Sequence, residues 1–160
     1  MKNPNAERYY LAYGSNLNIK QMKRRCPGAR IVGTSMILDY ELMFKGSQTG
    51  AYLTIEPHGD HAVPVAVWAV TPQDEVNLDR YEGYPTFYYK KEMEVLTRDR
   101  RNDAIRRVNA FVYIMHEERE MAMPSRRYVE TCAEGYNDFQ MNVKYLIDAI
   151  ERTKKGVGER

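Results

Sequence analysis

Glu82 has the sequence setting that most favours proton-transfer chemistry. It stands at the end of an expected helix, immediately before Gly83 and between Tyr81 and Tyr84. A carboxylate at a helix C-terminus meets the negative end of the helix dipole, and aromatic neighbours exclude water from it. Both effects raise the pKa of a carboxyl group toward neutrality, where a general acid and base works best. The alternative is an ordinary solvated glutamate at a helix end.

A second candidate is the turn formed by Tyr13, Gly14, Ser15 and Asn16. An apolar, aromatic strand runs into Gly14, and small or capping residues then precede an expected helix over residues 19–25. A strand, turn and helix in this order leave several backbone N–H groups unpaired and pointing one way, which favours an anion. These amides suit either a substrate carboxylate or a developing oxyanion. The alternative is a plain helix cap.

The histidines and cysteines give weaker signals. His58 and His61 share a loop with acidic neighbours, but their spacing fits no known metal frame, and His116 stands apart from them. Cys26 and Cys132 stand beside no histidine and form no C-x-x-C pair, so we expect buried structural thiols. We therefore expect neither a metal site nor a cysteine nucleophile.

The elements that must position these residues are short strands with helices between and after them. After the first strand, further strands are expected over residues 29–38, 40–44, 51–55, 63–70, 88–96 and 106–115. Polar loops are expected over residues 45–50 and 97–103, and the Pro57-His58-Gly59-Asp60 segment is expected to end a strand. The proline at position 64 should lie at the start or at an edge of its strand.

The helix that ends at the first candidate has the clearest local signals. Thr71 is a good N-cap, Pro72 suits the first helical position and Asp74 complements the dipole. We expect this helix to run to about Tyr81, with Gly83 as a left-handed terminator.

The C-terminal part of the chain is predicted to form two helices. Ser125 is expected to cap a helix over residues 126–134 that Gly135 ends, and Asn137 or Asp138 is expected to cap the last helix. An apolar stripe on that last helix is formed by Phe139, Val143, Leu146, Ile147 and Ile150. Residues 156–160 are expected to fray. The pattern predicts an α+β fold with a small mixed sheet, curled toward a β-barrel and flanked by helices.

Composition limits the class of protein. The 160 residues fit one domain spanning positions 1–160, with 43% hydrophobic and 29% charged residues. A net charge of +2 gives no reason to expect nucleic acid or a membrane surface as a partner. The first seven residues lack an apolar signal core, and no apolar run approaches ~18 residues, so we expect a cytoplasmic protein. The 13 tyrosines, against 4 phenylalanines, suit a core that surrounds a polar cavity, although an ordinary strand position explains any single tyrosine equally well.

Several segments together resemble one known family. The run Tyr13-Gly14-Ser15-Asn16-Leu17, the later run Leu78-Asp79-Arg80-Tyr81-Glu82-Gly83, then Tyr88 and the segment 124–128 appear in the order and spacing of that family. The chain thus resembles the γ-glutamylcyclotransferase-like family, which includes the AIG2-like proteins, from about residue 9 to residue 150. The resemblance implies a small mixed β-barrel with flanking helices and a cavity at one end.

The resemblance also implies roles for individual residues. Glu82 matches the family's catalytic glutamate, and the turn over residues 13–17 is implied to bind the γ-glutamyl moiety. Tyr88 and Tyr128 are similar to the family's cavity tyrosines, although core packing explains each hydroxyl equally well from the sequence alone. The implied substrate-binding residues are Tyr13, Gly14, Ser15, Asn16, Leu17, Tyr88 and Tyr128.

The implied activity is release of 5-oxoproline and a free amine from a γ-glutamyl amine or peptide, an acyltransferase or lyase reaction without metal or cofactor. The alternative is a non-catalytic AIG2-like protein that binds a small ligand in the same cavity. A third alternative is a hydrolase or acyltransferase that uses that pocket. The expected partner is a small γ-glutamyl substrate rather than nucleic acid or membrane. The sequence does not decide between a monomer and a homodimer.

Overall fold

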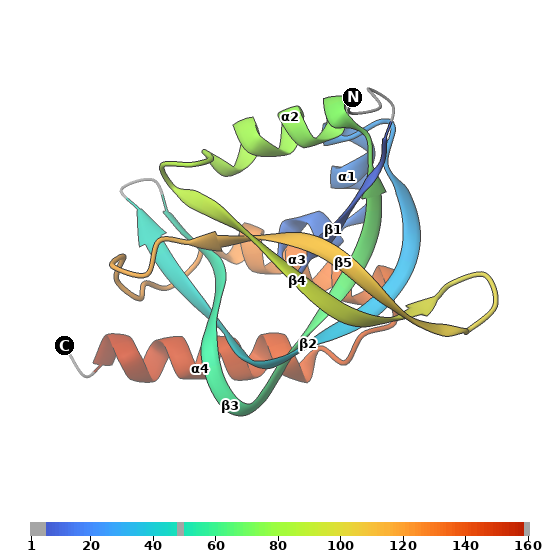
Figure 1. The fold of residues 1–160 in the computed structure, drawn as a ribbon. Helices are drawn as coiled ribbons and strands as arrows, with labels where there is room; N and C mark the ends of the chain where they lie inside the picture. Colours follow the sequence, from blue (N-terminus) through green and yellow to red (C-terminus); the bar gives the residue numbers. More distant parts are fainter. Residues whose placement is uncertain (1–5, 48–49, 159–160) are drawn as a thin grey trace.

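The computed structural model describes residues 6–47 and 50–158 of the chain and shows a closed barrel of five strands with helices around it (Figure 1). The strands are β1 (Arg8–Ala12), β2 (Arg30–Ser47), β3 (Gly50–Val70), β4 (Tyr88–Asp99) and β5 (Ile105–Met115). The helices are α1 (Ile19–Arg25), α2 (Pro72–Glu82), α3 (Arg126–Asp138) and α4 (Lys144–Gly158), with a short 3-10 turn η1 (Ser15–Leu17) before α1.

The barrel is mixed, as the sequence predicts. Its strand order is β1-β3-β2-β4-β5, and β5 closes the circle by pairing with β1 in parallel. The other neighbours pair antiparallel. Because β1 and β5 run in the same direction, both end at the same rim, and the residues that follow β1 enter η1 there.

Two strands are much longer than the sequence predicts. Asp39, which lies between two expected strands, is a bend inside the continuous strand β2, and the strand end expected at 57–60 lies inside β3. β2 and β3 pair with one another along most of their length. Asp39 and Asp60 take left-handed φ values of 61° and 65°. The ladder is interrupted there by a bulge, since residues 58–61 of β3 lie opposite Asp39 without a partner on β2 and the pairing resumes beyond it. β1 covers only residues 66–70 of β3, which leaves Pro57 and Pro64 on a stretch with one paired neighbour.

The two expected polar loops are shorter than predicted. β2 continues through residue 47 and β3 begins at residue 50, while residues 48 and 49 lie outside the described part of the chain. The first three residues of the expected 97–103 loop belong to β4, because Thr97 and Arg98 pair with β5 and Asp99 pairs with Gly33 of β2. The strand ends that polar composition predicts for these two hairpins are therefore wrong.

The helix α2 begins and ends as predicted. Thr71 and Asp74 form a reciprocal capping box, Pro72 occupies the first turn, and Gly83 follows the helix with a left-handed φ of 64°. The helix lies along the outside of the barrel (Figure 1). Its last residue, Glu82, lines a cavity together with residues of the turn that follows β1.

Gly135 does not end α3, contrary to the prediction. It lies inside the helix, which continues to Asp138. A Cβ atom at this position would lie 2.6 Å from the backbone carbon of Leu17, so glycine allows η1 to pack directly on α3. Asp138 accepts a hydrogen bond from the Ile19 amide at 3.0 Å, so it binds the first turn of α1 instead of capping the last helix.

The predicted apolar stripe of the last helix is partly wrong. α4 starts at Lys144 and buries Leu146 and Ala149, whereas Val143 and Ile147 are 43% and 50% exposed. The helix packs on β2, where the Phe44 amide donates to the Thr153 hydroxyl at 3.1 Å. It remains helical through Gly158, so the expected fraying at 156–158 is not seen, and 159–160 lie outside the described residues. Each described helix is too short or too polar to span a bilayer.

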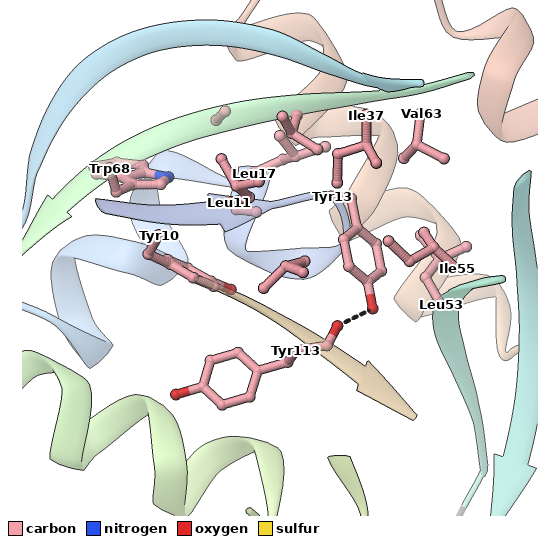
Figure 2. Close-up of a cluster of buried hydrophobic side chains, with 14 of the residues drawn as sticks. Tyr10, Leu11, Tyr13, Leu17, Ile37, Leu53, Ile55, Val63, Trp68 and Tyr113 are labelled. Carbon is pink, nitrogen blue, oxygen red and sulfur yellow. Dashed lines mark hydrogen bonds between the residues drawn. The ribbon is translucent and has the colours of Figure 1, made fainter. Parts of the chain in front are cut away.

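The core fills the barrel and includes residues of the β1 turn. Figure 2 shows Leu11, Leu53, Ile55 and Trp68 among its buried side chains. The ring of Tyr13 is also inside, where its hydroxyl donates to the Tyr113 carbonyl at 2.6 Å. That bond ties the start of the turn to β5 across the core.

Candidate active site

A cavity of about 300 Å³ opens at the rim where β1 ends. Its wall is contributed by β1, the turn after it, β3, the end of α2, β4, β5 and α3. The cavity therefore unites both sequence candidates and both implied tyrosines. The lining residues that matter below are Tyr10, Tyr13, Gly14, Ser15, Asn16, Arg80, Tyr81, Glu82, Tyr88, Tyr113 and Tyr128.

Glu82 is the acidic member of this wall. It is the last residue of α2 and is partly buried. Burial raises the pKa of its carboxyl group from 4.5 to about 7, while the nearby Arg25 acts in the opposite direction. Within the described residues its carboxylate has no hydrogen-bond or ion-pair partner. A free carboxyl group that is half protonated at neutral pH can both take up and release a proton.

Several tyrosines line the cavity together with Glu82. Burial, and after it the Glu82 charge, raises the pKa of Tyr10 and Tyr13 well above its ordinary value. Burial also raises the pKa of Tyr88 and Tyr128, with the Glu82 charge as a smaller cause. These phenols therefore stay protonated and neutral, and the low-polarity wall that they form keeps the Glu82 pKa high.

The turn after β1 presents unpaired amides to the same cavity. The amides of Leu17 and Asn18 bond to the carbonyls of Gly14 and Ser15, each at 3.0 Å. Within the described residues the N–H groups of Gly14, Ser15 and Asn16 have no backbone or side-chain acceptor. All three residues line the cavity, so their donors are available to an oxygen of a bound molecule. Asn18, rather than Ser15 or Asn16, caps α1 by accepting from the Gln21 amide.

Tyr88 and Tyr128, the two tyrosines that the family resemblance implies, line the cavity and also form hydrogen bonds with the backbone. The Tyr88 hydroxyl donates to the Leu53 carbonyl at 2.8 Å, and the Tyr128 hydroxyl accepts from the Leu53 amide at 3.1 Å. Both rings thus hold β3 at the cavity wall. Leu17 does not line the cavity, because its side chain is fully buried in the core. Its contribution to the turn is its backbone.

Arg25 is the main residue that sequence reasoning missed. It is the last residue of α1, and its guanidinium donates to the Ser15 hydroxyl at 3.1 Å and to the Asn16 side-chain oxygen. The same group lies over the Tyr81 ring, 3.4 Å from its centroid. A basic residue in the last turn of a short helix is an ordinary surface signal, so only the three-dimensional packing identifies it. Tyr10 was also missed, and its hydroxyl accepts from Nδ2 of the Asn16 side chain at 2.9 Å.

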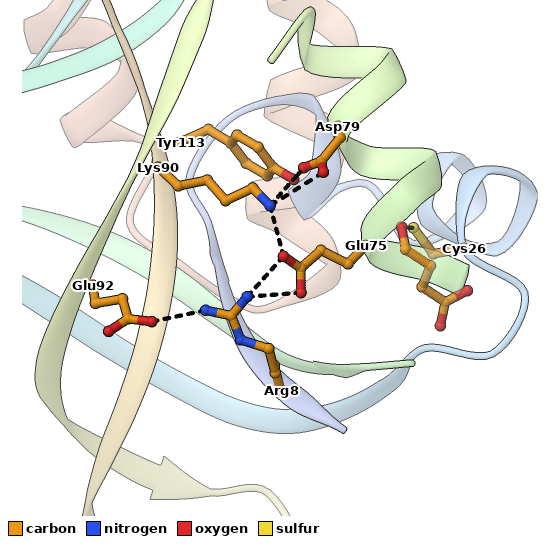
Figure 3. Close-up of polar contacts among 8 residues, drawn as sticks. Arg8, Cys26, Glu75, Asp79, Lys90, Glu92 and Tyr113 are labelled. Atoms are coloured by element: carbon orange, nitrogen blue, oxygen red, sulfur yellow. Dashed lines mark hydrogen bonds and ion pairs between the residues drawn. The ribbon is translucent and has the colours of Figure 1, made fainter. Parts of the chain in front are cut away.

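A polar network fixes α2, and hence Glu82, to the barrel (Figure 3). Lys90 on β4 lies 2.6 Å from Glu75 Oε2 and 2.9 Å from Asp79 Oδ1. Tyr113 on β5 donates its hydroxyl to Asp79 at 2.6 Å, and Arg8 on β1 donates to Glu75 at 2.7 Å. Three strands are therefore joined to one face of the helix that carries Glu82.

The cysteines lie outside this chemistry. Cys26 and Cys132 are both buried and free of disulfides. Burial raises the pKa of each thiol to about 12, so neither is ionised at neutral pH. This agrees with the expectation of structural thiols.

The histidines have other partners. His58, His61 and Glu41 place potential ligand atoms within 4.8 Å of one another. However, Arg152 Nε lies 3.1 Å from the Glu41 oxygen that faces both rings, so a guanidinium already supplies positive charge there. His116 donates from Nε2 to the Pro85 carbonyl at 2.7 Å, which makes it a contact of the loop after α2.

Comparison with known proteins gives the same family that the motifs suggested. The profile of the family "Gamma-glutamyl cyclotransferase, AIG2-like" matches residues 10–131. No curated protein sequence matches the chain.

Solved structures share the fold. A protein described as a gamma-glutamyl cyclotransferase is 25% identical, with a TM-score of 0.76 over 93% of this chain and 87% of its own. An uncharacterized human protein is 26% identical, with a TM-score of 0.76 over 92% of this chain and 86% of its own. A yeast gamma-glutamyl cyclotransferase described as specific to glutathione is 13% identical, covers 94% of this chain and 99% of its own with a TM-score of 0.57, and shows the fold alone.

The profile match covers most of the chain and includes the β1 turn, Glu82, Tyr88 and Tyr128. The closed mixed barrel and its helices agree with the fold of these neighbours. The chain therefore belongs to the gamma-glutamyl cyclotransferase, AIG2-like family.

Proposed function

We propose that this protein is a cyclotransferase that converts a γ-glutamyl amine or peptide into 5-oxoproline and the free amine. The observation that carries the proposal is the unpaired Glu82 carboxyl group, with its pKa raised to about 7, in a cavity that also presents free turn amides. Membership of the family supports the same class of reaction. A cavity of about 300 Å³ suits a small substrate.

The proposed reaction is an intramolecular acyl transfer. The α-amino nitrogen of the substrate attacks the carbon of its own γ-carbonyl and closes the five-membered ring. Glu82 accepts the proton that the α-ammonium must lose and passes it to solvent. It then takes the second proton that the attacking nitrogen loses as the ring forms, and delivers it to the departing nitrogen. The bond between the γ-carbon and that nitrogen breaks, which leaves 5-oxoproline and the neutral amine. General acid and base catalysis of this kind contributes about 10²–10⁴ in rate.

The turn amides have a matching role in this proposal. The N–H groups of Gly14, Ser15 and Asn16 would hold either the substrate's α-carboxylate or the oxyanion of the tetrahedral intermediate. Either contact fixes one end of the γ-glutamyl chain while Glu82 moves the proton. Since ring closure needs the chain folded on itself, such positioning contributes to the rate beside the proton transfer.

A substrate panel tests the proposal. We would incubate the protein with γ-glutamyl amino acids, γ-glutamyl amines and glutathione, the last because one neighbour is described as specific to it. The proposal predicts 5-oxoproline and free amine in equal amounts from at least one compound. Free glutamate instead of 5-oxoproline would indicate a hydrolase. Thermal stabilisation by γ-glutamyl compounds without any product would indicate a binding protein, and either result would overturn the proposal.

A further inference from the structure

Arg25 lies behind the candidate site and contacts both of its halves. It does not line the cavity, but its guanidinium carbon lies 3.4 Å from the centroid of the Tyr81 ring, and Tyr81 directly precedes Glu82. On its other side the guanidinium reaches the turn after β1. Such a stacked guanidinium is held in one plane, so its N–H groups point in fixed directions.

The hydrogen bonds of Arg25 leave the turn little freedom. Nη1 donates to Ser15 Oγ at 3.1 Å and to Asn16 Oδ1, and Nη2 donates to Gln21 Oε1 at 2.9 Å. Asn16 then donates to the Tyr10 hydroxyl on β1 at 2.9 Å. The Arg25 side chain thus joins the turn to α1, and the Asn16 side chain joins it to the barrel.

The end of α2 is tied to the same arginine. The Ser15 and Tyr81 hydroxyls lie 3.3 Å apart, so the turn and the helix end also contact one another directly. Asn77 on α2 donates from its side chain to the Arg25 carbonyl at 3.0 Å. Backbone and side chain of Arg25 therefore both join α1 to α2.

We propose that Arg25 is the positioning residue of this site, which holds the Ser15–Asn16 amides at a fixed place relative to the α2 terminus that carries Glu82. The part of this inference that concerns turnover rests on the proposed function. The geometric part, the coupling of turn and helix end, does not depend on it.

The charge of Arg25 has a second consequence for the site. It lowers the pKa of Glu82 against the larger effect of burial. The other groups that interact electrostatically with Glu82 are phenols, namely Tyr10, Tyr13, Tyr81, Tyr88, Tyr113 and Tyr128. They are neutral at physiological pH, and Arg80, the other charged residue of the wall, is exposed. Loss of Arg25 should therefore raise the pKa of Glu82 further.

Three variants separate the two effects. Arg25→Met removes both the charge and the hydrogen bonds, whereas Arg25→Lys keeps the charge but has neither the planar fork nor the stacking surface. Arg24→Met removes the same charge from the exposed neighbouring position and serves as the control. For each variant we would measure kcat, KM and the pH dependence of kcat/KM, and follow folding by circular dichroism.

We expect KM to rise about tenfold in Arg25→Met, which corresponds to about 1.4 kcal/mol, because charged hydrogen bonds to the turn are lost. In the pH profile of kcat/KM, the acid limb of the wild type should lie near pH 7, and the acid limb of Arg25→Met should lie at a higher pH. Arg25→Lys should raise KM and leave the acid limb in place, and Arg24→Met should change neither. A folded Arg25→Met protein with wild-type KM and a wild-type acid limb would overturn the proposal.

A titration of Glu82 keeps this inference separate from the proposed activity. The ¹³C resonance of its carboxyl group, assigned by its loss in Glu82→Gln, reports the pKa without any substrate. If the wild type releases no 5-oxoproline, the proposed function fails, and the backbone amide ¹H and ¹⁵N resonances of Ser15, Asn16 and Tyr81 then decide the role of Arg25. Displacement of these resonances in Arg25→Lys, which keeps the charge, together with wild-type resonances in Arg24→Met, supports the inference. Wild-type amide resonances in a folded Arg25→Lys or Arg25→Met protein overturn it.

Discussion

The ammonium group of Lys90 on β4 lies 2.9 Å from Oδ1 of Asp79 on α2, three residues before Glu82. The same ammonium lies 2.6 Å from Glu75, one turn earlier on the helix. Both Lys90 and Glu75 side chains are only 16% exposed, so these are ion pairs at a largely desolvated interface. The position of the proposed catalytic carboxylate is therefore set from the barrel wall as well as by its own helix.

Lys90→Met should destabilise the protein and lower its activity together. The change leaves the carboxylates of Glu75 and Asp79 with fewer partners at a poorly solvated interface, which should cost about 1–3 kcal/mol of unfolding free energy. Urea denaturation measures this loss. Arg107→Met, which removes an exposed ion pair to Glu94, is the matched control and should cost less than about 0.5 kcal/mol. Equal costs for the two variants would contradict the role given to Lys90.

Gly135→Ala should displace the turn from α3. The new methyl group would lie 2.6 Å from Leu17 and 2.7 Å from the Asn18 nitrogen, and both contacts involve backbone atoms that cannot swing aside. We expect a loss of about 1–3 kcal/mol in stability together with a higher KM. Gly59→Ala is the control, since a Cβ there meets nothing within 4 Å. Wild-type stability and KM in Gly135→Ala would show that the close packing is not needed.

Glu82 should also make the stability of the protein depend on pH. Its pKa rises from 4.5 to about 7 on folding, so between these values the folded state binds more protons than the unfolded state. Its contribution is thus fully present below pH 4.5 and is lost as the pH rises through 7. Glu82→Gln stays neutral, so its stability relative to the wild type should increase by up to about 3 kcal/mol between pH 4.5 and pH 8.

Thermal or urea unfolding of Glu82→Gln and of the wild type across this pH range measures the difference between their free energies of unfolding. Glu118→Gln, at an exposed position, is the control and should follow the wild type at every pH. A constant difference between Glu82→Gln and the wild type would mean that folding does not perturb the Glu82 carboxyl group.

Local signals predicted those parts of the fold that depend on neighbouring residues. The start of α2 is the clearest case, because Thr71, Pro72 and Asp74 act on the helix that they begin. Glu82 and Gly83 were placed correctly for the same reason, as the left-handed glycine ends the helix by its own backbone conformation.

The features that were predicted wrongly or missed depend on contacts between residues far apart in the chain. Gly135 has the sequence signature of a helix end, yet its reason is the contact with Leu17, 118 residues earlier. Asp138 looks like a cap for the following helix but binds the Ile19 amide of α1. The turn-like segment around Asp60 is a bulge inside β3, because the pairing with β2 resumes on both sides of it, at Pro57 with Tyr40 and at Ala62 with Leu38. Arg25 was missed because its partners on α2 are brought to it only by folding.

The proposed role of Glu82 is tested most directly by the rate at which Glu82→Gln releases 5-oxoproline from the best substrate of the wild type. The substitution preserves the size of the side chain and removes its ability to exchange a proton, so we predict that kcat falls by about 10²–10⁴. KM should stay within a few-fold of the wild-type value, and Glu118→Gln should retain full activity. A folded Glu82→Gln protein with wild-type kcat would contradict the account.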